Sequence, residues 1–248
     1  MSTVKTSAII TKATPYREHD KLLTLFTLNR GKIVALCKKS RHTLNRWNSS
    51  FEPPLLCQIQ LYEKNQYYTI TEIDVEEPYL TLSRSYQNML TVQSMSHIVE
   101  HFTMPEMEQS SLFYLLQSTL YTLEKKECSG LFAMYYFALQ FLKESGFTLQ
   151  FKTCAKCNSA FTEKWFSFSL QHNLLCCHQC TLHNSIYPRF DWSLLSQLET
   201  LYYISFNEMK QNEDFLFNYS EIDRIMKELY KGFLSKECLT IHHLNSFS

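Results

Sequence analysis

The sequence contains little glycine: 4 residues in 248, where average usage would give about 17. This scarcity argues against the glycine-rich loops that bind nucleotide phosphates. A P-loop would need a glycine five residues before Gly31, and Phe26 occupies that position. The chain also has no His-Glu-x-x-His motif and no His-x-Glu motif of the zinc deaminases. These absences predict a binding protein and not an enzyme.

Long apolar runs are absent as well. A membrane-spanning helix needs about 20 apolar residues, whereas the longest mostly apolar run, at 131–142, is shorter and already contains Gln140. Near the N-terminus, Thr11 and Lys12 interrupt the short apolar run at 8–10, so we expect no signal peptide. The sequence therefore predicts a cytoplasmic protein without a membrane partner.

Acidic residues are scarce in one region of the chain. The whole sequence has 24 basic and 24 acidic residues and a formal net charge of zero. Residues 1–50 hold ten bases against two acids, Glu18 and Asp20, and no acid occurs between Asp20 and Glu52. Such asymmetry indicates a surface that binds a polyanion such as nucleic acid. The alternative is a solvated surface whose charge is neutralised by acids from elsewhere in the fold.

The first 79 residues have the pattern of a small barrel. Five short segments rich in β-branched and aromatic residues are separated by turn residues, and Asn29-Arg30-Gly31 and Lys64-Asn65-Gln66 are typical of hairpin turns. We expect strands at 4–14, 21–28, 32–37, 55–62 and 67–75. Five strands that close within 80 residues predict an OB-type barrel over residues 1–79.

From residue 80 onward the apolar spacing becomes that of helices. The helix expected at 131–145 is apolar on nearly every side, which predicts a central and buried position. A cysteine-rich module at about 151–185 interrupts the helical pattern. The fold class is therefore α+β, with a helical domain at 80–248 that carries the inserted module. The expected helices are 81–102, 109–125, 131–145, 191–204 and 221–234.

Four of the nine cysteines form two regular pairs, Cys154-x2-Cys157 and Cys177-x2-Cys180, with 19 residues between the pairs. Each pair can supply two thiolates to one tetrahedral zinc ion. Because the protein would fill all four positions, such an ion is structural and has no open place for a substrate. The sequence predicts one zinc ion on these four cysteines.

Other interpretations of the cysteines stay open. Two disulfides are the first alternative, although a reducing cytoplasm disfavours them, and a redox role for one pair is the second. Cys176 lies beside Cys177, so it is a candidate to replace a predicted ligand. Three histidines are close enough in sequence to do the same: His172, His178 and His183.

A set of motifs follows in a fixed order along the chain. Lys5-Thr6 opens the first expected strand, residues 16–27 have the pattern Y-x-E-x-D-K-L-L-T-L-F-T, and Gly31-Lys32-Ile33 precedes a basic stretch. Pro53-Pro54-Leu55-Leu56 then leads into a strand, and paired CxxC motifs lie inside a helical region. This order resembles the RecO family of bacterial recombination mediators over essentially the whole chain. One departure is that the Gly-Gly pair often found before the second CxxC is replaced by Q-H-N-L-L-C at 171–176.

The resemblance implies an OB-fold domain, a helical domain and a zinc module inserted into the latter. Proteins of this family bind single- and double-stranded DNA and anneal complementary strands without ATP. They cooperate with RecR and help to load RecA onto single strands coated by single-strand-binding protein (SSB), whose C-terminal tail they contact. The resemblance therefore implies DNA, RecR and the SSB tail as partners, with RecA as an indirect one, for a cytoplasmic protein that joins the nucleoid when it acts.

The basic residues of the N-terminal region are the expected DNA contacts. Together they would neutralise phosphates on two strands and lower the repulsion that slows annealing. An aromatic ring in the same stretch is a candidate for base stacking, although a partly buried position is its alternative. The predicted DNA-binding residues are Arg17, Lys21, Lys32, Lys38, Lys39, Arg41 and Arg46, with Trp47 as the stacking ring.

Two other functions are compatible with the same residues. A zinc-stabilised factor could use the barrel for RNA, and contacts to the ribose 2′-hydroxyl would then make it prefer RNA over DNA. A structural adaptor could use the basic stretch for an acidic protein partner. Such an adaptor would bind no nucleic acid even at low salt, where phosphate contacts are strongest.

Overall fold

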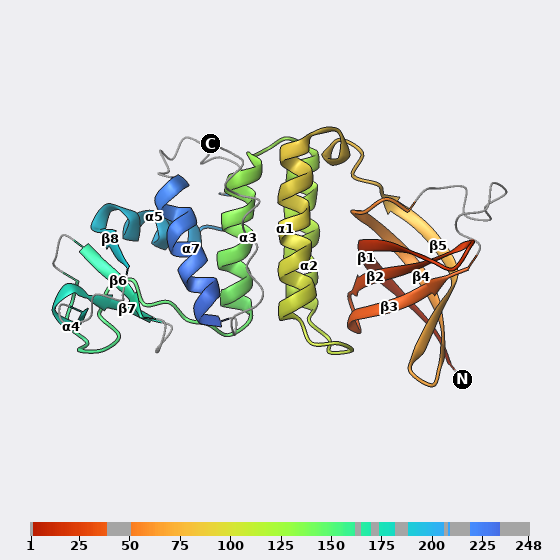
Figure 1. Cartoon of the computed structure of the whole chain (residues 1–248), viewed down its shortest axis with the longest axis horizontal. Coiled ribbons are helices and arrows are strands. Elements are labelled where there is room, and N and C mark those ends of the chain that lie inside the picture. The colour runs from red at the N-terminus through yellow and green to blue at the C-terminus, as the bar shows by residue number, and fades with distance from the viewer. Residues whose placement is uncertain are drawn as a thin grey trace. The chain divides into compact units, whose positions relative to one another are not determined.

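The computed structural model describes residues 2–38, 51–161, 165–169, 174–181, 188–205, 208 and 219–233 (Figure 1). By its internal contacts the chain divides into two compact units, Met1–Glu127 and Cys128–Ser248. The first unit holds a barrel and two helices, and the second holds a buried helix, a small sheet and the cysteine pairs. No helix within the described ranges is long and apolar enough to cross a membrane.

Five strands close into a barrel in the first unit. Neighbouring strands follow the order β1-β2-β3-β5-β4, and β4 pairs back with β1. All pairs are antiparallel except β3 with β5. A closed five-stranded barrel followed by helices confirms the predicted fold class. The strands are β1 (Ser2–Tyr16), β2 (Asp20–Thr27), β3 (Gly31–Cys37), β4 (Leu55–Lys64) and β5 (Tyr67–Glu77).

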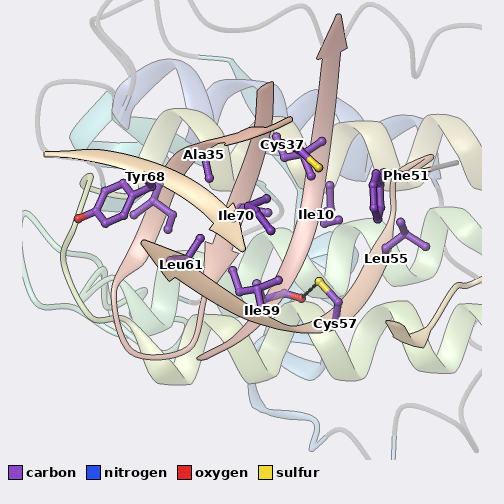
Figure 2. Packing of buried hydrophobic residues seen from close by; sticks show 14 residues of the cluster. Ile10, Ala35, Cys37, Phe51, Leu55, Cys57, Ile59, Leu61, Tyr68 and Ile70 are labelled. Carbon is purple, nitrogen blue, oxygen red and sulfur yellow. Dashed lines mark hydrogen bonds between the residues drawn. The ribbon is translucent and has the colours of Figure 1, made fainter. Parts of the chain in front are cut away.

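The barrel interior is filled by alternate residues of each strand (Figure 2). In β3, Ile33 and Ala35 are buried while Val34 between them is 53% exposed, as the period of two in a strand requires. Cys57 is a buried thiol that donates to the Ala8 carbonyl at 3.4 Å, and burial raises its pKa to about 12. The core residues are Ala8, Ile10, Leu23, Leu25, Ile33, Ala35, Cys37, Phe51, Leu55, Cys57, Ile59, Leu61, Tyr68 and Ile70.

Two helices follow the barrel in the same unit. A short 3-10 turn, η1 (Leu82–Arg84), leads into α1 (Tyr86–Phe102), and α2 (Ser110–Glu124) comes next. The carboxylate of Glu124 accepts a hydrogen bond from the Thr81 N–H at 3.0 Å. This bond ties the end of α2 to the chain just before α1. Both helices agree with the sequence prediction to within a few residues.

The segment after α1 packs on the turn between β2 and β3. Gly31 in that turn has a φ of +58°, a left-handed conformation that favours glycine. A Cβ at Gly31 would lie 2.0 Å from the carbonyl oxygen of Met107. The Glu106 N–H donates to the Lys32 carbonyl at 3.2 Å and extends this contact. The turn therefore needs glycine both for its backbone conformation and for the close approach of the segment.

The second unit is built around a buried helix. α3 (Gly130–Glu144) is buried at every position from Phe132 to Leu142, which confirms the predicted central helix. The side-chain amide of Gln140 in this run donates to the carbonyls of Leu201 and Tyr202, both at 3.0 Å. These bonds satisfy a polar group that would otherwise be costly to bury.

A small sheet and further helices complete the described part of the second unit. The sheet has the strand order β7-β6-β8. Asp191 is the N-cap of the helix after the sheet, because its carboxylate accepts from the Ser193 N–H at 2.8 Å. The elements are β6 (Trp165–Ser169), β7 (Leu174–Cys177), α4 (His178–Thr181), β8 (Arg189–Asp191), α5 (Trp192–Tyr203) and α7 (Tyr219–Phe233).

The domain boundary predicted at residue 79 falls where the strands end and the helices begin. Internal contacts group α1 and α2 with the barrel, and the second compact unit starts at Cys128. One reason is the packing of Glu106 and Met107 on the β2–β3 turn, which joins the helical part of the first unit to its strands. The division into domains at residue 79 stays a prediction.

We expect Gly31→Ala to lower the stability of the first unit. A Cβ in the left-handed conformation costs about 1–2 kcal/mol, and the forced overlap adds about 1–3 kcal/mol. Gly146→Ala is the matched control, because Gly146 also has a positive φ, of 90°, but nothing lies within 4 Å of its Cβ position. Urea unfolding followed by circular dichroism measures both variants. Equal losses in the two would contradict the importance of the contact with Met107.

Candidate metal centre and nucleic-acid interface

A tight turn holds the first cysteine pair. The Cys154 N–H donates to the Ser159 carbonyl at 2.9 Å, and the Cys154 carbonyl accepts from the Asn158 N–H at 2.8 Å. Asn158 has a φ of +57°, a left-handed conformation in which asparagine is enriched. These bonds fold the chain back on itself around Cys154 and Cys157.

The second pair lies where a strand meets a helix. Cys177 is the last residue of β7, and Cys180 lies three residues later in α4. The Thr181 hydroxyl donates to the Cys177 carbonyl at 3.0 Å and supports the junction. The Ala155 N–H donates to the Leu175 carbonyl at 3.0 Å, so the first turn is joined directly to β7.

The sulfur atoms of Cys154, Cys157, Cys177 and Cys180 lie within 4.8 Å of one another. The Sγ atoms of Cys157 and Cys177 are 3.7 Å apart. Four sulfurs at the corners of a tetrahedron, each about 2.3 Å from a zinc ion, are about 3.8 Å apart. The cluster thus has the size of a metal site, and the structure brings together the four cysteines that the sequence predicts as ligands.

Cys176 and His178, the other candidate ligands among the described residues, lie outside this group of four. Cys176 is only 2% exposed, and burial raises its pKa to about 11, which keeps its thiol neutral. The ring of His178 packs edge-on against Trp165, with the ring centroids 5.5 Å apart. Two candidates fall outside the described residues: His172 and His183.

Hydrogen bonds lower the pKa of two of the four cysteine thiols. The N–H groups of Cys177 and Lys156 lie 3.3 Å and 3.4 Å from the Cys154 Sγ. Burial alone would raise the pKa of Cys154, but the backbone N–H groups that donate to its sulfur outweigh burial and lower it. Hydrogen bonds from Ser159 lower the pKa of Cys157 to about 6. The pKa values of two of the four thiols are therefore lowered, and a bound cation would favour the thiolate form of all four.

Three of the predicted DNA-binding residues gather at one end of the barrel. Arg17 lies in the turn between β1 and β2, and its guanidinium is 5.2 Å from the centroid of the Tyr16 ring. Lys38 follows the last residue of β3 and is exposed. Lys21 lies beside the end of β3, but its ammonium is 3.6 Å from the Glu52 carboxylate and its side chain is only 15% exposed. Arg17 and Lys38 are thus accessible to phosphates, whereas Lys21 already has an acidic partner.

Lys32 lies at the opposite end of β3 from Lys38. Its ammonium donates to the Glu100 carbonyl, and burial lowers its pKa. The structure therefore does not bring Lys32 into one groove with Lys38, and the side chain instead links the β2–β3 turn to α1. The other predicted DNA-binding residues lie outside the described residues: Lys39, Arg41, Arg46 and Trp47.

Residues that sequence reasoning missed lie on the β4–β5 hairpin. Together with Lys38 they line a groove of about 460 Å³. The sequence feature that could have indicated these groove residues is the position of Lys64 and Tyr67 on either side of the expected hairpin turn. That signal is weak, because lysine and tyrosine are common beside turns. The charged and aromatic residues of the groove are Lys38, Tyr62, Lys64 and Tyr67.

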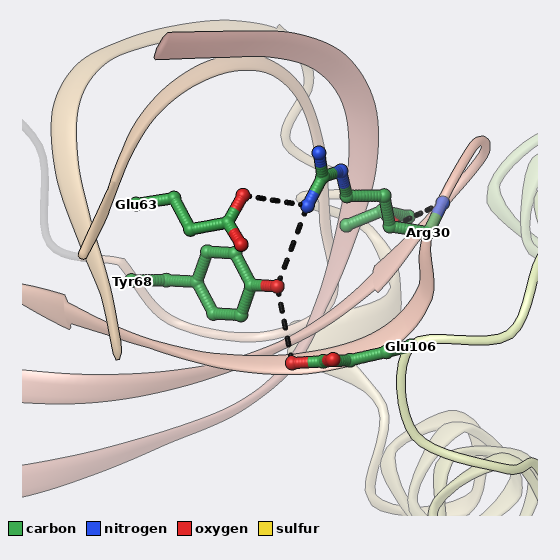
Figure 3. Close-up of polar contacts among 5 residues, drawn as sticks. Arg30, Glu63, Tyr68 and Glu106 are labelled. Atoms are coloured by element: carbon green, nitrogen blue, oxygen red, sulfur yellow. Dashed lines mark hydrogen bonds and ion pairs between the residues drawn. The ribbon is translucent and has the colours of Figure 1, made fainter. Parts of the chain in front are cut away.

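A polar network holds the other face of the same hairpin (Figure 3). Arg30 Nη1 donates to Glu63 Oε2 at 2.8 Å and to the Tyr68 hydroxyl at 3.4 Å. The Tyr68 hydroxyl donates in turn to Glu106 at 3.0 Å. Burial raises the pKa of Tyr68, and the hydrogen bond to Glu106 raises it further, so the hydroxyl keeps its proton. The network ties the hairpin to the β2–β3 turn and to the segment after α1.

Comparison with known proteins agrees with this architecture. The family model described as "Recombination protein O N terminal" matches residues 1–79, and the one described as "Recombination protein O C terminal" matches residues 83–231. A "DNA repair protein RecO" of Acetivibrio thermocellus is 30% identical over 179 residues, which are 71% of this chain and 70% of that protein. The protein of that name in Caldicellulosiruptor bescii is 28% identical over 186 residues, 75% of each chain. The one in Desulforamulus reducens is 20% identical over 245 residues, 99% of this chain and 95% of that protein.

We expect the purified protein to hold about one divalent metal ion per chain, and Cys157→Ala to lose it, because three remaining thiolates leave the site open. Cys176→Ala is the matched control, since it removes a neighbouring buried thiol that lies outside the group of four. Inductively coupled plasma mass spectrometry measures the metal content. The ligand set would be contradicted by equal metal content in both variants.

Proposed function

The chain belongs to the RecO family of DNA repair proteins, and on that premise we propose that it binds single- and double-stranded DNA and anneals complementary strands without ATP. The observation that carries this proposal is the closed five-stranded barrel with exposed Arg17 and Lys38 at one end. Barrels of the OB type bind nucleic-acid strands through a basic groove and stacked aromatic rings.

The proposed mechanism is electrostatic. Complementary strands repel each other through their phosphates, and basic side chains that neutralise those phosphates reduce the repulsion. Arg17 and Lys38 supply this charge on the barrel, and Trp47 offers a ring for a base. Base pairing itself supplies the free energy, so no nucleotide hydrolysis is needed. Three further bases belong to the stretch after Lys38: Lys39, Arg41 and Arg46.

The proposed role includes protein partners. As a recombination mediator, the protein works with RecR and contacts the C-terminal tail of SSB. Single strands coated by SSB then become accessible to RecA. The support for these partners is membership of the family.

The metal of the four-cysteine cluster is zinc in this proposal. Four thiolates in a group of this size are the donor set of structural zinc sites. Since Cys154, Cys157, Cys177 and Cys180 fill every position, the ion has no place for a substrate. Its role is to fold the module, because binding of such an ion and folding are coupled.

We expect the protein to bind a labelled single strand of mixed sequence with an affinity that falls steeply with salt. If about six phosphates are neutralised, log affinity falls with log salt at a slope of about −4 between roughly 50 and 200 mM. Changing Lys38, Lys39 and Arg41 together to alanine should reduce the magnitude of this slope by about 2, because three phosphate contacts are lost. Fluorescence anisotropy measures the affinity, and the melting temperature should stay nearly the same.

Lys32→Ala is the control for that experiment, because the Lys32 ammonium is bound to the Glu100 carbonyl and should leave the slope unchanged. Absence of binding at about 50 mM salt would contradict the DNA proposal and favour an adaptor for an acidic protein. Tighter binding to RNA than to DNA of equal sequence would favour the RNA-binding alternative.

The protein should also speed the annealing of complementary strands coated with SSB in the absence of ATP. We expect a lower rate when SSB lacks its C-terminal tail, because the protein then loses its contact with the coated strand. A pair of strands labelled with a fluorophore and a quencher reports the rate. Equal rates with complete and tailless SSB would argue against the tail contact, while uncoated strands serve as the control for annealing itself.

A further inference from the structure

The β4–β5 hairpin turns different side chains to its two faces. On the outer face, Lys64 pairs with Tyr67 and Tyr62 pairs with Thr69. Their neighbours along the strands are core residues of the barrel or members of the network around Arg30. Within the described part of the chain, the outer face is therefore available to a ligand while the inner face holds the hairpin.

The outer side chains form the groove of about 460 Å³ together with Lys38 from the end of β3. Binding sites for small ligands have volumes of roughly 300–1,000 Å³. The charged lining residues are Lys38 and Lys64, and none of the described residues that line the groove is acidic. Thr69 adds a hydroxyl group, whereas the Thr71 hydroxyl already donates to the Gln60 carbonyl at 3.0 Å. The groove thus offers positive charge and hydrogen-bonding groups to an anionic ligand.

Tyr67 gives this groove an aromatic surface. It is 79% exposed, the highest value among the large apolar side chains of the described residues. An aromatic ring left in water contributes little to folding, because its apolar surface is not buried. A ring beside lysines suits a strand whose base stacks while its phosphates are neutralised. In a duplex both faces of each base are already stacked, so such a ring selects unpaired bases.

The aromatic surface is held in place without a ligand. Asn65 and Gln66 have φ values of 50° and 63°, as in the two-residue turns that match the twist of a hairpin. On the other face, Arg30 binds both Glu63 and Tyr68 (Figure 3). The bond from Arg30 also gives the Glu63 carboxylate a basic partner, and Glu63 lies in β4 between the outer residues Tyr62 and Lys64. A surface held in this way loses less freedom when a strand binds.

Acidic residues mark the end of the groove along β5. Glu72, Asp74 and Glu76 are exposed along β5 beyond Thr71. Their charge repels phosphates, so on this face of the sheet a bound strand is confined to the hairpin end and to Lys38. The favourable region is therefore short and suits a few nucleotides at most.

We propose that the groove lined by Lys38, Tyr62, Lys64 and Tyr67 holds an unpaired nucleotide of a DNA strand. Its base stacks on Tyr67, and Lys38 and Lys64 neutralise the adjoining phosphates. This inference rests on the proposed function, and it adds the part of the barrel that distinguishes single strands from duplexes. Lys38 belongs both to this groove and to the basic end of the barrel.

Tyr67→Ala tests the stacking. We expect it to weaken binding of a single strand about 5-fold or more and to leave the affinity for a duplex nearly unchanged. The melting temperature of the protein should stay the same, because Tyr67 is exposed. Tyr67→Phe should keep the affinity, because it keeps the ring. Tyr86→Ala is the matched control, since Tyr86 is 69% exposed at the start of α1 and should have no effect. Fluorescence anisotropy measures each affinity.

Lys64→Ala tests the charge. It should reduce the magnitude of the salt slope for a single strand by about 0.7, the effect of losing one phosphate contact. Lys126→Ala is the matched control, because Lys126 is an exposed lysine that follows α2 and lies outside the groove. Equal slopes in the two variants would overturn the assignment of Lys64 to a phosphate.

A third measurement uses the unaltered protein. A single strand that contains 5-iodouracil should cross-link to Tyr67 under ultraviolet light, and peptide mass spectrometry locates the product. Unchanged single-strand affinity in Tyr67→Ala, with no cross-link on the hairpin, would overturn the inference while leaving DNA binding intact. Failure of the unaltered protein to bind any DNA would overturn the proposed function, and this inference with it.

Discussion

The barrel, and with it the proposed groove, depends on a short parallel ladder between β3 and β5. The other neighbouring strands share seven or more residue pairs, whereas this ladder has two. It closes the barrel and brings Lys38, which follows β3, to the same groove as Tyr67 of β5. Arg30 supports the closure from the other side, because it binds the hydroxyl of Tyr68 in the ladder. The paired residues are Ala35 with Tyr68 and Leu36 with Thr69.

The basic residues of the N-terminal region divide into structural and accessible ones, and the division depends on distant parts of the chain. Arg30 binds a carboxylate 33 positions later, and Lys32 binds a carbonyl 68 positions later. Lys21 forms an ion pair with Glu52. Arg17 and Lys38 remain accessible at the end of the barrel. A basic residue in such a run can therefore bind a polyanion only if its side chain is not already bound to a carboxylate or carbonyl elsewhere in the fold.

Much of the fold follows from local sequence signals, and so does the cysteine group that could hold a metal ion. Alternating apolar residues predict the strands, and the two CxxC pairs predict the cysteine group because each pair needs only one turn. The aromatic surface is different. Tyr67 and Tyr68 are adjacent and chemically identical, yet one is exposed and the other buried. The period of two along β5 accounts for the burial of Tyr68 with Ile70. The pairing of Tyr68 with Ala35 of the neighbouring strand β3, which brings Tyr67 and Lys38 to one groove, is a long-range contact that no local pattern reveals.

The two proposed kinds of DNA contact give annealing a direction. Phosphates are present on single strands and duplexes alike, so in the proposed function the basic end of the barrel would hold both and bring complementary strands together. Stacking on Tyr67 is available only to an unpaired base, since pairing returns the base to its own stack. Each base pair formed therefore removes the contact that favours the single strand and leaves only the phosphate contacts. In the proposed mechanism the duplex lacks the stacking contact that favours the single strand, so its release requires no ATP.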